Sequence, residues 1–122
     1  MRMVDICIEE MQSMIYKKYD YTIDDVFEEA CKIFKLDKHI VVSRHKGREY
    51  VFCRFIIAYV SRVCLGYKLA DISRVLGFDD HTAACYSIKK VNQWLDTKDA
   101  LFMRYWGKYI AESKIWGLYN EK

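Results

Sequence analysis

Apolar residues recur every three to four positions along most of this 122-residue chain, which is the spacing of one face of an α-helix. A first stripe lies in residues 1–19, and a second begins after Thr22 and runs to Phe34. Thr22 is followed three positions later by Asp25, a spacing typical of a capping box at a helix start. The chain has no proline, and no stretch alternates long enough to predict a sheet. The pattern therefore predicts an all-α fold of five to seven helices.

The middle of the chain predicts a short element followed by a long helix. The stretch "LDKHIVVS" contains a run with strand character, but an isolated strand would have no partner, so we expect a short helical turn or a linker. A long helix follows from Gly47, and Gly66 marks its end. Its expected buried face consists of Val51, Phe55, Ala58, Tyr59 and the aliphatic stem of Arg62.

The stretch "KLADISRVLGFDDHTAACYSIKKVNQWL" divides at a glycine into two helical patterns. We expect a short helix from Leu69 to Leu76, a turn at Gly77–Phe78 and a longer helix from about Asp80 to Leu95. The inner faces would be formed by Leu69, Ile72 and Leu76 and by Ala84, Ile88, Val91 and Leu95. Two helices joined by a tight turn of this kind predict a central helix-turn-helix, whose second helix normally enters the DNA major groove by its N-terminal residues.

Length and composition favour one domain, residues 1–122, with a buried core, because half of the residues are apolar (52%). We expect an acidic N-terminal helix (1–21), a core (22–95) and an aromatic C-terminal helix (96–122). No run approaches the roughly 18 apolar residues of a membrane span. Acidic residues interrupt the first ten positions, where a signal peptide would be apolar. The expected location is therefore the cytoplasm, without a membrane partner.

Five cysteines, at positions 7, 31, 53, 64 and 85, form no CxxC pair and stand mostly among apolar neighbours. An odd number without regular spacing does not predict a disulfide framework. We interpret these cysteines as small buried residues of a protein from a reducing compartment.

Basic charge is concentrated in the middle of the chain. Residues 32–68 carry 9 basic and 2 acidic side chains, whereas residues 1–31 carry 3 basic and 8 acidic ones. The densest stretch is "SRHKGREYVFCR". Such a patch is typical of a phosphate-binding surface. A solvated loop that keeps the protein soluble has the same composition, so charge alone leaves both interpretations open.

Four polar residues, Asp79, Asp80, His81 and Thr82, stand together at the start of the second predicted helix. One aspartate is expected to cap that helix, because a carboxylate accepts a backbone N–H and is favoured by the helix dipole. Zinc needs about four ligands, and His81 with Cys85 has no complementary pair elsewhere. A nuclease-like site would need a further acidic cluster for divalent ions, and none is present. We therefore expect no metal, no cofactor and no enzymatic activity.

The stretch from about Ile23 to Val91 resembles the C-terminal DNA-binding domain of the bacterial replication initiator DnaA. That domain carries aspartate-histidine-threonine-threonine at the start of its recognition helix, and here "DHTA" stands at Asp80 to Ala83. The preceding "LADISRVLGF" is similar to the family's leucine-rich helix that ends in glycine. Upstream, "FKLDKHIVVSRHKGREYVFCRFIIAYVSR" is similar to its helix, basic loop and long helix without a gap. The resemblance covers a little over half of the chain and implies a helix-turn-helix that binds double-stranded DNA.

The resemblance also implies a role for four basic residues of the middle segment. Arg44, Lys46 and Arg48 match the family's basic loop, which contacts phosphates. Arg54, near the start of the long helix, matches the arginine that family members insert into the minor groove.

In the second helix the resemblance implies base contacts from Asp80, His81 and Thr82, with the aspartate accepting from a cytosine amine and the other two touching thymine methyl groups. Lys90 matches a basic position toward the end of that helix, where it would contact a phosphate.

Two positions depart from the family pattern. Asp79 replaces the arginine that usually precedes the aspartate and reads a guanine edge, and an acid cannot donate two hydrogen bonds to guanine O6 and N7. Ala83 replaces the second threonine. We therefore expect an altered sequence specificity. No GxxxxGK[ST] loop for an ATPase occurs in the chain.

The C-terminal segment "ALFMRYWGKYIAESKIWGLYN" lies beyond the resemblance and is rich in aromatic residues, among them Tyr105, Trp106, Tyr109 and Trp116. A helix packed on the helix-turn-helix would explain them. A surface for a protein partner or for self-association also would, because tyrosine and tryptophan are common interface anchors. A platform for single-stranded nucleic acid is a third interpretation.

Two function classes follow. The leading hypothesis is a stand-alone double-stranded DNA-binding protein in replication or transcription control, suited to a chromosome, a phage or a mobile element. The alternative is a protein-interaction module that kept the helical scaffold and lost DNA binding, which Asp79 and the acidic N-terminal segment would favour.

Overall fold

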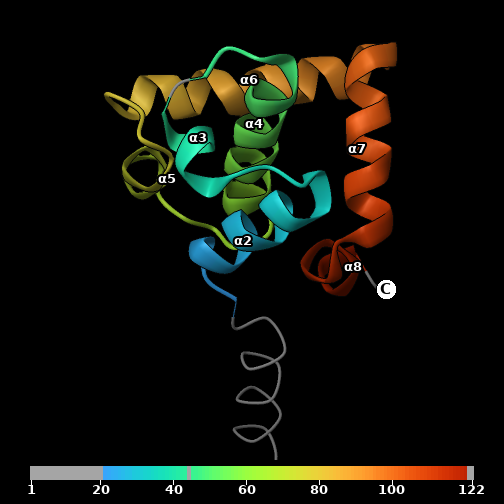
Figure 1. Cartoon of the computed structure of the whole chain (residues 1–122), viewed down its shortest axis with the longest axis horizontal. Coiled ribbons are helices and arrows are strands. Elements are labelled where there is room, and N and C mark those ends of the chain that lie inside the picture. The colour runs from blue at the N-terminus through green and yellow to red at the C-terminus, as the bar shows by residue number, and fades with distance from the viewer. Residues whose placement is uncertain (1–20, 44, 121–122) are drawn as a thin grey trace, which may run out of the picture.

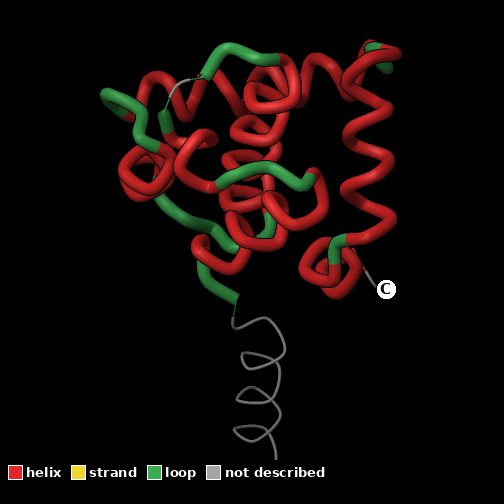
Figure 2. Tube along the Cα trace, viewed as in Figure 1, coloured by secondary structure: helices red, strands yellow, loops and turns green. Residues whose placement is uncertain are grey.

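A computed structural model gives the structure of the protein and describes residues 21–43 and 45–120. These residues form seven helices, namely α2 (Ile23–Phe34), α3 (Lys38–Val42), α4 (Arg48–Val63), α5 (Leu69–Leu76), α6 (His81–Thr97), α7 (Ala100–Glu112) and α8 (Lys114–Asn120) (Figure 1). No strand occurs in the described residues (Figure 2). The prediction of an all-α fold is thus confirmed, whereas the predicted acidic N-terminal helix lies outside the described residues.

Helix α4 is the centre of the fold, and α2, α3, α5, α6 and α7 all pack against it. Its buried apolar side chains are Phe52, Cys53, Ile56, Ile57, Ala58, Val60 and, just after its last residue, Cys64. The predicted inner face is therefore confirmed at Ala58 and in part at Phe55 and Tyr59, which are half-buried and pack against the core. Val51 is only half-buried, and the prediction was wrong at Arg62, which is exposed. A helix that is covered from several directions buries more than one stripe, so a single 3.6-residue pattern does not locate its core face.

Local sequence signals set the starts of the first two described helices. Thr22 Oγ1 accepts a hydrogen bond from the Asp25 N–H at 3.2 Å, and the Thr22 N–H donates to Asp25 Oδ2 at 2.8 Å. This is the predicted capping box. Helix α3 is the short helical turn expected within "LDKHIVVS", and its start is capped by Asp37 Oδ1, which accepts from the His39 N–H at 2.8 Å.

The C-terminal segment forms two helices rather than one. Helix α7 ends at Glu112, and Ser113 separates it from α8. Glu29 of α2 stabilises this junction from 84 residues away: its Oε1 accepts from Ser113 Oγ at 2.6 Å, and its Oε2 accepts from the Lys114 N–H at 2.8 Å. The end of the chain is thereby tied to the first described helix.

The aromatic residues of α7 and α8 are mainly part of the core. Tyr109 is fully buried and Trp106 is 6% exposed, with the Trp106 ring 4.9 Å from that of Trp116 and 5.8 Å from that of Tyr59. Tyr105 and Trp116 are half-buried. Packing on the core therefore explains most of these aromatic residues, for which the sequence had also allowed a surface for a protein partner.

The four described cysteines are free thiols, and Cys31, Cys53 and Cys64 are buried as predicted, while Cys85 is half-buried. Burial raises the pKa of the Cys64 thiol to about 12. Among the described residues, no helix combines the length and apolar character needed to cross a membrane.

Candidate nucleic-acid interface

The turn between α5 and α6 requires glycine. Gly77 has a φ of 76°, in the left-handed region, and the Phe78 N–H closes the helix end by donating to the carbonyl oxygen of Ser73 at 2.9 Å. A Cβ atom on Gly77 would lie 2.8 Å from the carbonyl oxygen of Val42, at the end of α3. The predicted turn is confirmed, and it packs tightly against the element that precedes the basic loop.

Asp80 is the cap of α6. Its Oδ1 accepts from the Thr82 N–H at 2.9 Å, and its backbone is extended. Its carbonyl oxygen also accepts a hydrogen bond at 2.9 Å from Oγ of Ser73, a buried residue of α5. The expectation that one aspartate caps the second helix is therefore confirmed, and these bonds hold the start of α6 at a defined position relative to α5.

The tip of the helix-turn-helix, defined here as Asp79, Asp80, His81 and Thr82, is exposed at all four residues. On one side it opens into a groove of about 660 Å³ that is shared with α4. Phe78 of the predicted turn and Tyr86, neither of which was a candidate site residue by sequence, also line this groove. Tyr86 is exposed one turn beyond the tip, with its ring 6.2 Å from the Phe55 ring of α4. The sequence could have identified Tyr86 as part of this site, because it follows Thr82 by four residues and residues four apart share one face of a helix.

Arg54 lies at the junction of the tip groove, α3 and the basic loop, and it is buried (7% exposed). Its Nη1 donates to the carbonyl oxygen of Val41 at 2.9 Å and its Nη2 to that of His45 at 2.8 Å. Burial lowers the pKa of the guanidinium, which as an arginine still remains charged at neutral pH. The resemblance assigns Arg54 to the DNA minor groove. In this structure its guanidinium instead binds the backbone of α3, at Val41, and of the basic loop, at His45.

The basic loop connects α3 to α4. Lys46 in the loop and Arg48, the first residue of α4, are exposed, whereas Arg44 lies outside the described residues. His45 shapes the loop, because its Nδ1 accepts from the Gly47 N–H at 2.9 Å and its ring lies 4.5 Å from that of Tyr50. Figure 1 shows that the loop starts close to the turn between α5 and α6. The start of the loop thus lies beside the turn that leads to the tip.

Lys90 lies apart from this group. It follows His81 by nine residues, which corresponds to about 13 Å along the helix axis at 1.5 Å per residue. Its ammonium lies 5.6 Å from the Trp94 ring centroid and 3.5 Å from Gln93 Oε1. Within the described residues, no group of three or more His, Cys, Asp or Glu side chains converges as a metal site would require.

A tight glycine turn, a capped second helix and an exposed polar tip define a helix-turn-helix of the kind that places its second helix in the major groove. The family described as the bacterial dnaA protein helix-turn-helix matches residues 23–91. The chain belongs to this family, and so to a class of domains that bind double-stranded DNA and are not catalytic.

Relatives from three bacterial species share one name, chromosomal replication initiator protein DnaA. The chain is 28% identical over 85 residues to the chromosomal replication initiator protein DnaA of Campylobacter jejuni, covering 70% of this chain and 19% of that protein. It is 30% identical over 79 residues to DnaA of Herpetosiphon aurantiacus, covering 65% and 16% of the two chains. The match to DnaA of Bacteroides thetaiotaomicron is 28% over 75 residues, 62% and 16% of the two chains. The chain thus spans less than a fifth of the length of these relatives, and no solved structure matches it.

Proposed function

We propose that this protein binds duplex DNA with the tip of α6 in the major groove and the basic loop on the phosphates, and that it acts in replication or transcription control. One observation carries the proposal: four exposed polar side chains stand at the start of α6, where Ser73 and the Asp80 cap hold them in place. The names of the relatives, which are replication initiators, favour a replication role.

Capping and base reading are compatible at Asp80. An ionised carboxylate has two oxygens with about four acceptor sites, and the Thr82 N–H occupies one of them. The remaining acceptor capacity suits the amine of cytosine. His81 and Thr82 extend from the first turn of the same helix and provide contacts to the neighbouring base pair, the thymine methyl included.

The phosphate contacts come from the basic loop. Lys46 and Arg48 are exposed and border the start of α4, a 16-residue helix whose N-terminus has no side-chain cap. The positive end of that helix dipole adds to the attraction for phosphate. We include Arg44 among the phosphate contacts because it belongs to the same basic stretch of the sequence. Arg54 contributes by holding the loop through Val41 and His45.

An altered specificity follows from the chemistry of Asp79. This exposed carboxylate stands at the outer edge of the tip, where an arginine would donate to a guanine. A carboxylate accepts hydrogen bonds only, so a cytosine amine replaces guanine as its favoured base-edge partner.

Selection from a random duplex pool tests binding and specificity together. We expect an enriched motif of a few base pairs, with affinity that falls as the salt concentration rises. The matched control is the double variant His81→Ala/Thr82→Ala, which removes two of the four proposed base-reading side chains and keeps the loop; it should bind duplex with weaker enrichment than the native chain. No enrichment with the native chain, together with salt-independent or absent binding, would contradict DNA binding and favour the protein-interaction module.

A further inference from the structure

A second groove, of about 730 Å³, lies between the end of α2, the start of α4 and one face of α7. Four cationic side chains line it, namely Lys35, Arg48, Arg104 and Lys108, against a single acid, Glu49. Two of the four cations come from α7, which lies beyond the residues that match the DnaA family. The groove therefore depends on a segment of this chain that lies outside the matched residues.

The charge of this groove is not a general property of the surface. A groove of about 410 Å³ between α2 and α8 is lined by four acids, Asp25, Glu28, Glu29 and Glu112, and by only two lysines, Lys32 and Lys114. Cations and anions thus predominate in different grooves, one beside the end of α2 and one along α2. A concave surface lined by one sign of charge concentrates ligands of the opposite sign.

The cations are available to an incoming anion. All four are exposed. Lys108 Nζ lies 3.1 Å from Glu112 Oε2, but the two side chains are 48% and 50% exposed. Exposed pairs of this kind contribute little to stability, so a phosphate can replace the carboxylate as the partner of Lys108 at small cost.

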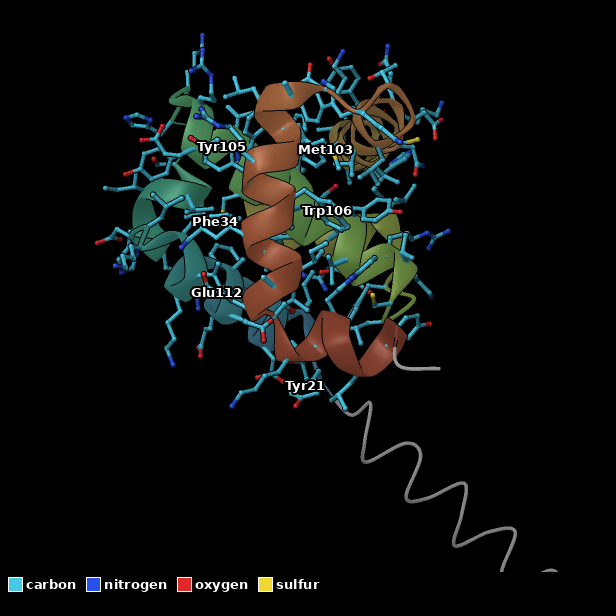
Figure 3. All side chains as sticks on the ribbon, turned by 90° about the vertical axis from the view of Figure 1, so that its right-hand side faces the viewer. Tyr21, Phe34, Met103, Tyr105, Trp106 and Glu112 are labelled. Carbon is cyan, nitrogen blue, oxygen red and sulfur yellow. The ribbon has the colours of Figure 1, made fainter. Side chains whose placement is uncertain are left out.

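The apolar part of the groove includes three half-buried aromatic rings, those of Phe34, Tyr50 and Tyr105. The Tyr105 ring packs against the ring of buried Phe52, at 5.0 Å between centroids, and lies 5.9 Å from the Phe34 ring. Figure 3 shows Phe34 and Tyr105 on the same side of α7. Rings held in place beside a row of cations are the combination on which single strands stack their bases. A duplex hides its base faces and would use the cations alone.

The groove is also far from the tip. Helix α6 has 17 residues, which span about 25 Å. The tip stands at its N-terminal end and α7 follows its C-terminal end, so the two surfaces lie at opposite ends of α6 (Figure 1). A strand in the groove is therefore separate from the base pairs that the tip would read.

We propose that this groove binds single-stranded nucleic acid, with phosphates on Arg104 and Lys108 and unpaired bases on the rings of Tyr105 and Phe34. The inference does not depend on duplex binding by the tip. Arg48 lines the groove and is also a proposed phosphate contact for duplex DNA, so it is left unchanged in the experiments that separate the two sites.

The first test measures fluorescence anisotropy of a labelled oligothymidylate of about 12 nucleotides, within the usual site size of 4–16. The double variant Arg104→Gln/Lys108→Gln should bind at least about tenfold more weakly, and its salt slope should fall by about 1.4, or about 0.7 for each lost phosphate contact. The matched control is Lys32→Gln/Lys114→Gln, which removes two exposed lysines from the acidic groove. Equal losses in both variants, or no binding by the native chain, would overturn the proposal.

A second pair of variants tests stacking. Tyr105→Phe keeps the ring and should retain affinity, whereas Tyr105→Leu should lose about tenfold, since one base stacked on an aromatic ring is worth about that factor. Circular dichroism and thermal melting establish that both variants are folded. Equal affinity of the two, or competition by polyglutamate as effective as that by oligothymidylate, would show a general polyanion site and reject the proposal.

Cross-testing separates this inference from the proposed function. His81→Ala/Thr82→Ala should leave oligothymidylate binding unchanged, and Arg104→Gln/Lys108→Gln should leave duplex binding unchanged. Binding of the oligonucleotide without binding of duplex DNA would support the groove site and contradict the proposed function. Binding of duplex DNA without binding of the oligonucleotide would support the proposed function and overturn the inference. Weaker duplex binding with unchanged single-strand binding in the α7 variant would overturn the inference.

Discussion

Arg54 in α4 donates a hydrogen bond from Nη1 to the carbonyl oxygen of Val41, the buried residue near the end of α3, at 2.9 Å. Its Nη2 donates to the carbonyl oxygen of His45, in the basic loop, at 2.8 Å. One guanidinium therefore fixes both the end of α3 and the backbone of the loop, which makes Arg54 a positioning residue of the basic loop.

The first prediction concerns this guanidinium. Arg54→Ala should lower the free energy of unfolding by about 2–4 kcal/mol, because two hydrogen bonds to a charged donor are lost and two carbonyl groups lose their partner. Arg54→Lys should recover only part of it, since an ammonium lacks the planar fork that reaches both carbonyls. Urea unfolding measures both.

Arg62→Ala is the matched control, because Arg62 is exposed and makes one bond, to the Tyr67 carbonyl oxygen at 2.9 Å. It should cost less than about 1 kcal/mol. If Arg54→Ala instead weakened duplex binding and left stability unchanged, Arg54 would be a direct DNA contact and the positioning role would be wrong.

The second prediction uses two glycines with the same backbone and different surroundings. Gly66 and Gly77 have φ values of 74° and 76°, but only the Cβ of a Gly77→Ala variant would meet a neighbour, Val42 O at 2.8 Å. Gly66→Ala should cost about 1 kcal/mol through backbone strain. Gly77→Ala should cost at least about 1 kcal/mol more, because α3 must move. Equal losses in thermal melting would show that the turn tolerates a Cβ.

The third prediction concerns the bond between the two ends of the described chain. Glu29→Gln should release α8, because an amide has one acceptor oxygen where the carboxylate now serves Ser113 and Lys114. The expected loss is about 1–2 kcal/mol, with faster hydrogen exchange at the amides of 113–119. Glu28→Gln, at an exposed position on the same helix, is the control and should leave that exchange unchanged.

The fourth prediction concerns Lys46 as a phosphate contact. Lys46→Ala should weaken binding about equally on all duplexes and reduce the salt slope by about 0.9, the value for one contact on duplex DNA. Lys32→Ala removes the same charge from the acidic groove and should leave the slope unchanged. Titrations at several salt concentrations decide this, and a sequence-dependent effect of Lys46→Ala would mean that the loop reads bases.

The fifth prediction concerns the tip. Asp79→Arg should restore affinity for a site of the initiator type, whereas Asp79→Asn removes the same negative charge without supplying a bidentate donor to guanine. His81→Ala should cost about 1–3 kcal/mol of discrimination at one base pair. Competition between matched and scrambled duplexes measures these effects. A uniform gain for both Asp79 variants on every duplex would mean that Asp79 only repels phosphate, and altered specificity would be rejected.

The sequence by itself determined those features whose interactions are local. The capping box of Thr22 and Asp25 spans three residues, and the Asp80 cap spans two. The turn at Gly77 closes through Ser73 and Phe78, five residues apart. Such contacts depend only on neighbours in the sequence, so residue type and spacing were enough to predict the starts of α2 and α6 and the turn between α5 and α6.

The tertiary structure decided everything that depends on distant parts of the chain. Glu29 is an ordinary exposed-face acid by its sequence pattern, and only folding brings it to Ser113, 84 residues away. The sequence pattern gives Arg54 no partner, but in the folded chain it donates to the backbone of α3 and of the basic loop. The cations of α7 likewise gain a common groove with Arg48 only because α7 packs beside α2 and α4. Periodicity identifies the buried face of a helix that is covered from one side. The element that packs on that face, and the extra faces buried in a central helix such as α4, depend on tertiary contacts that the sequence pattern does not specify.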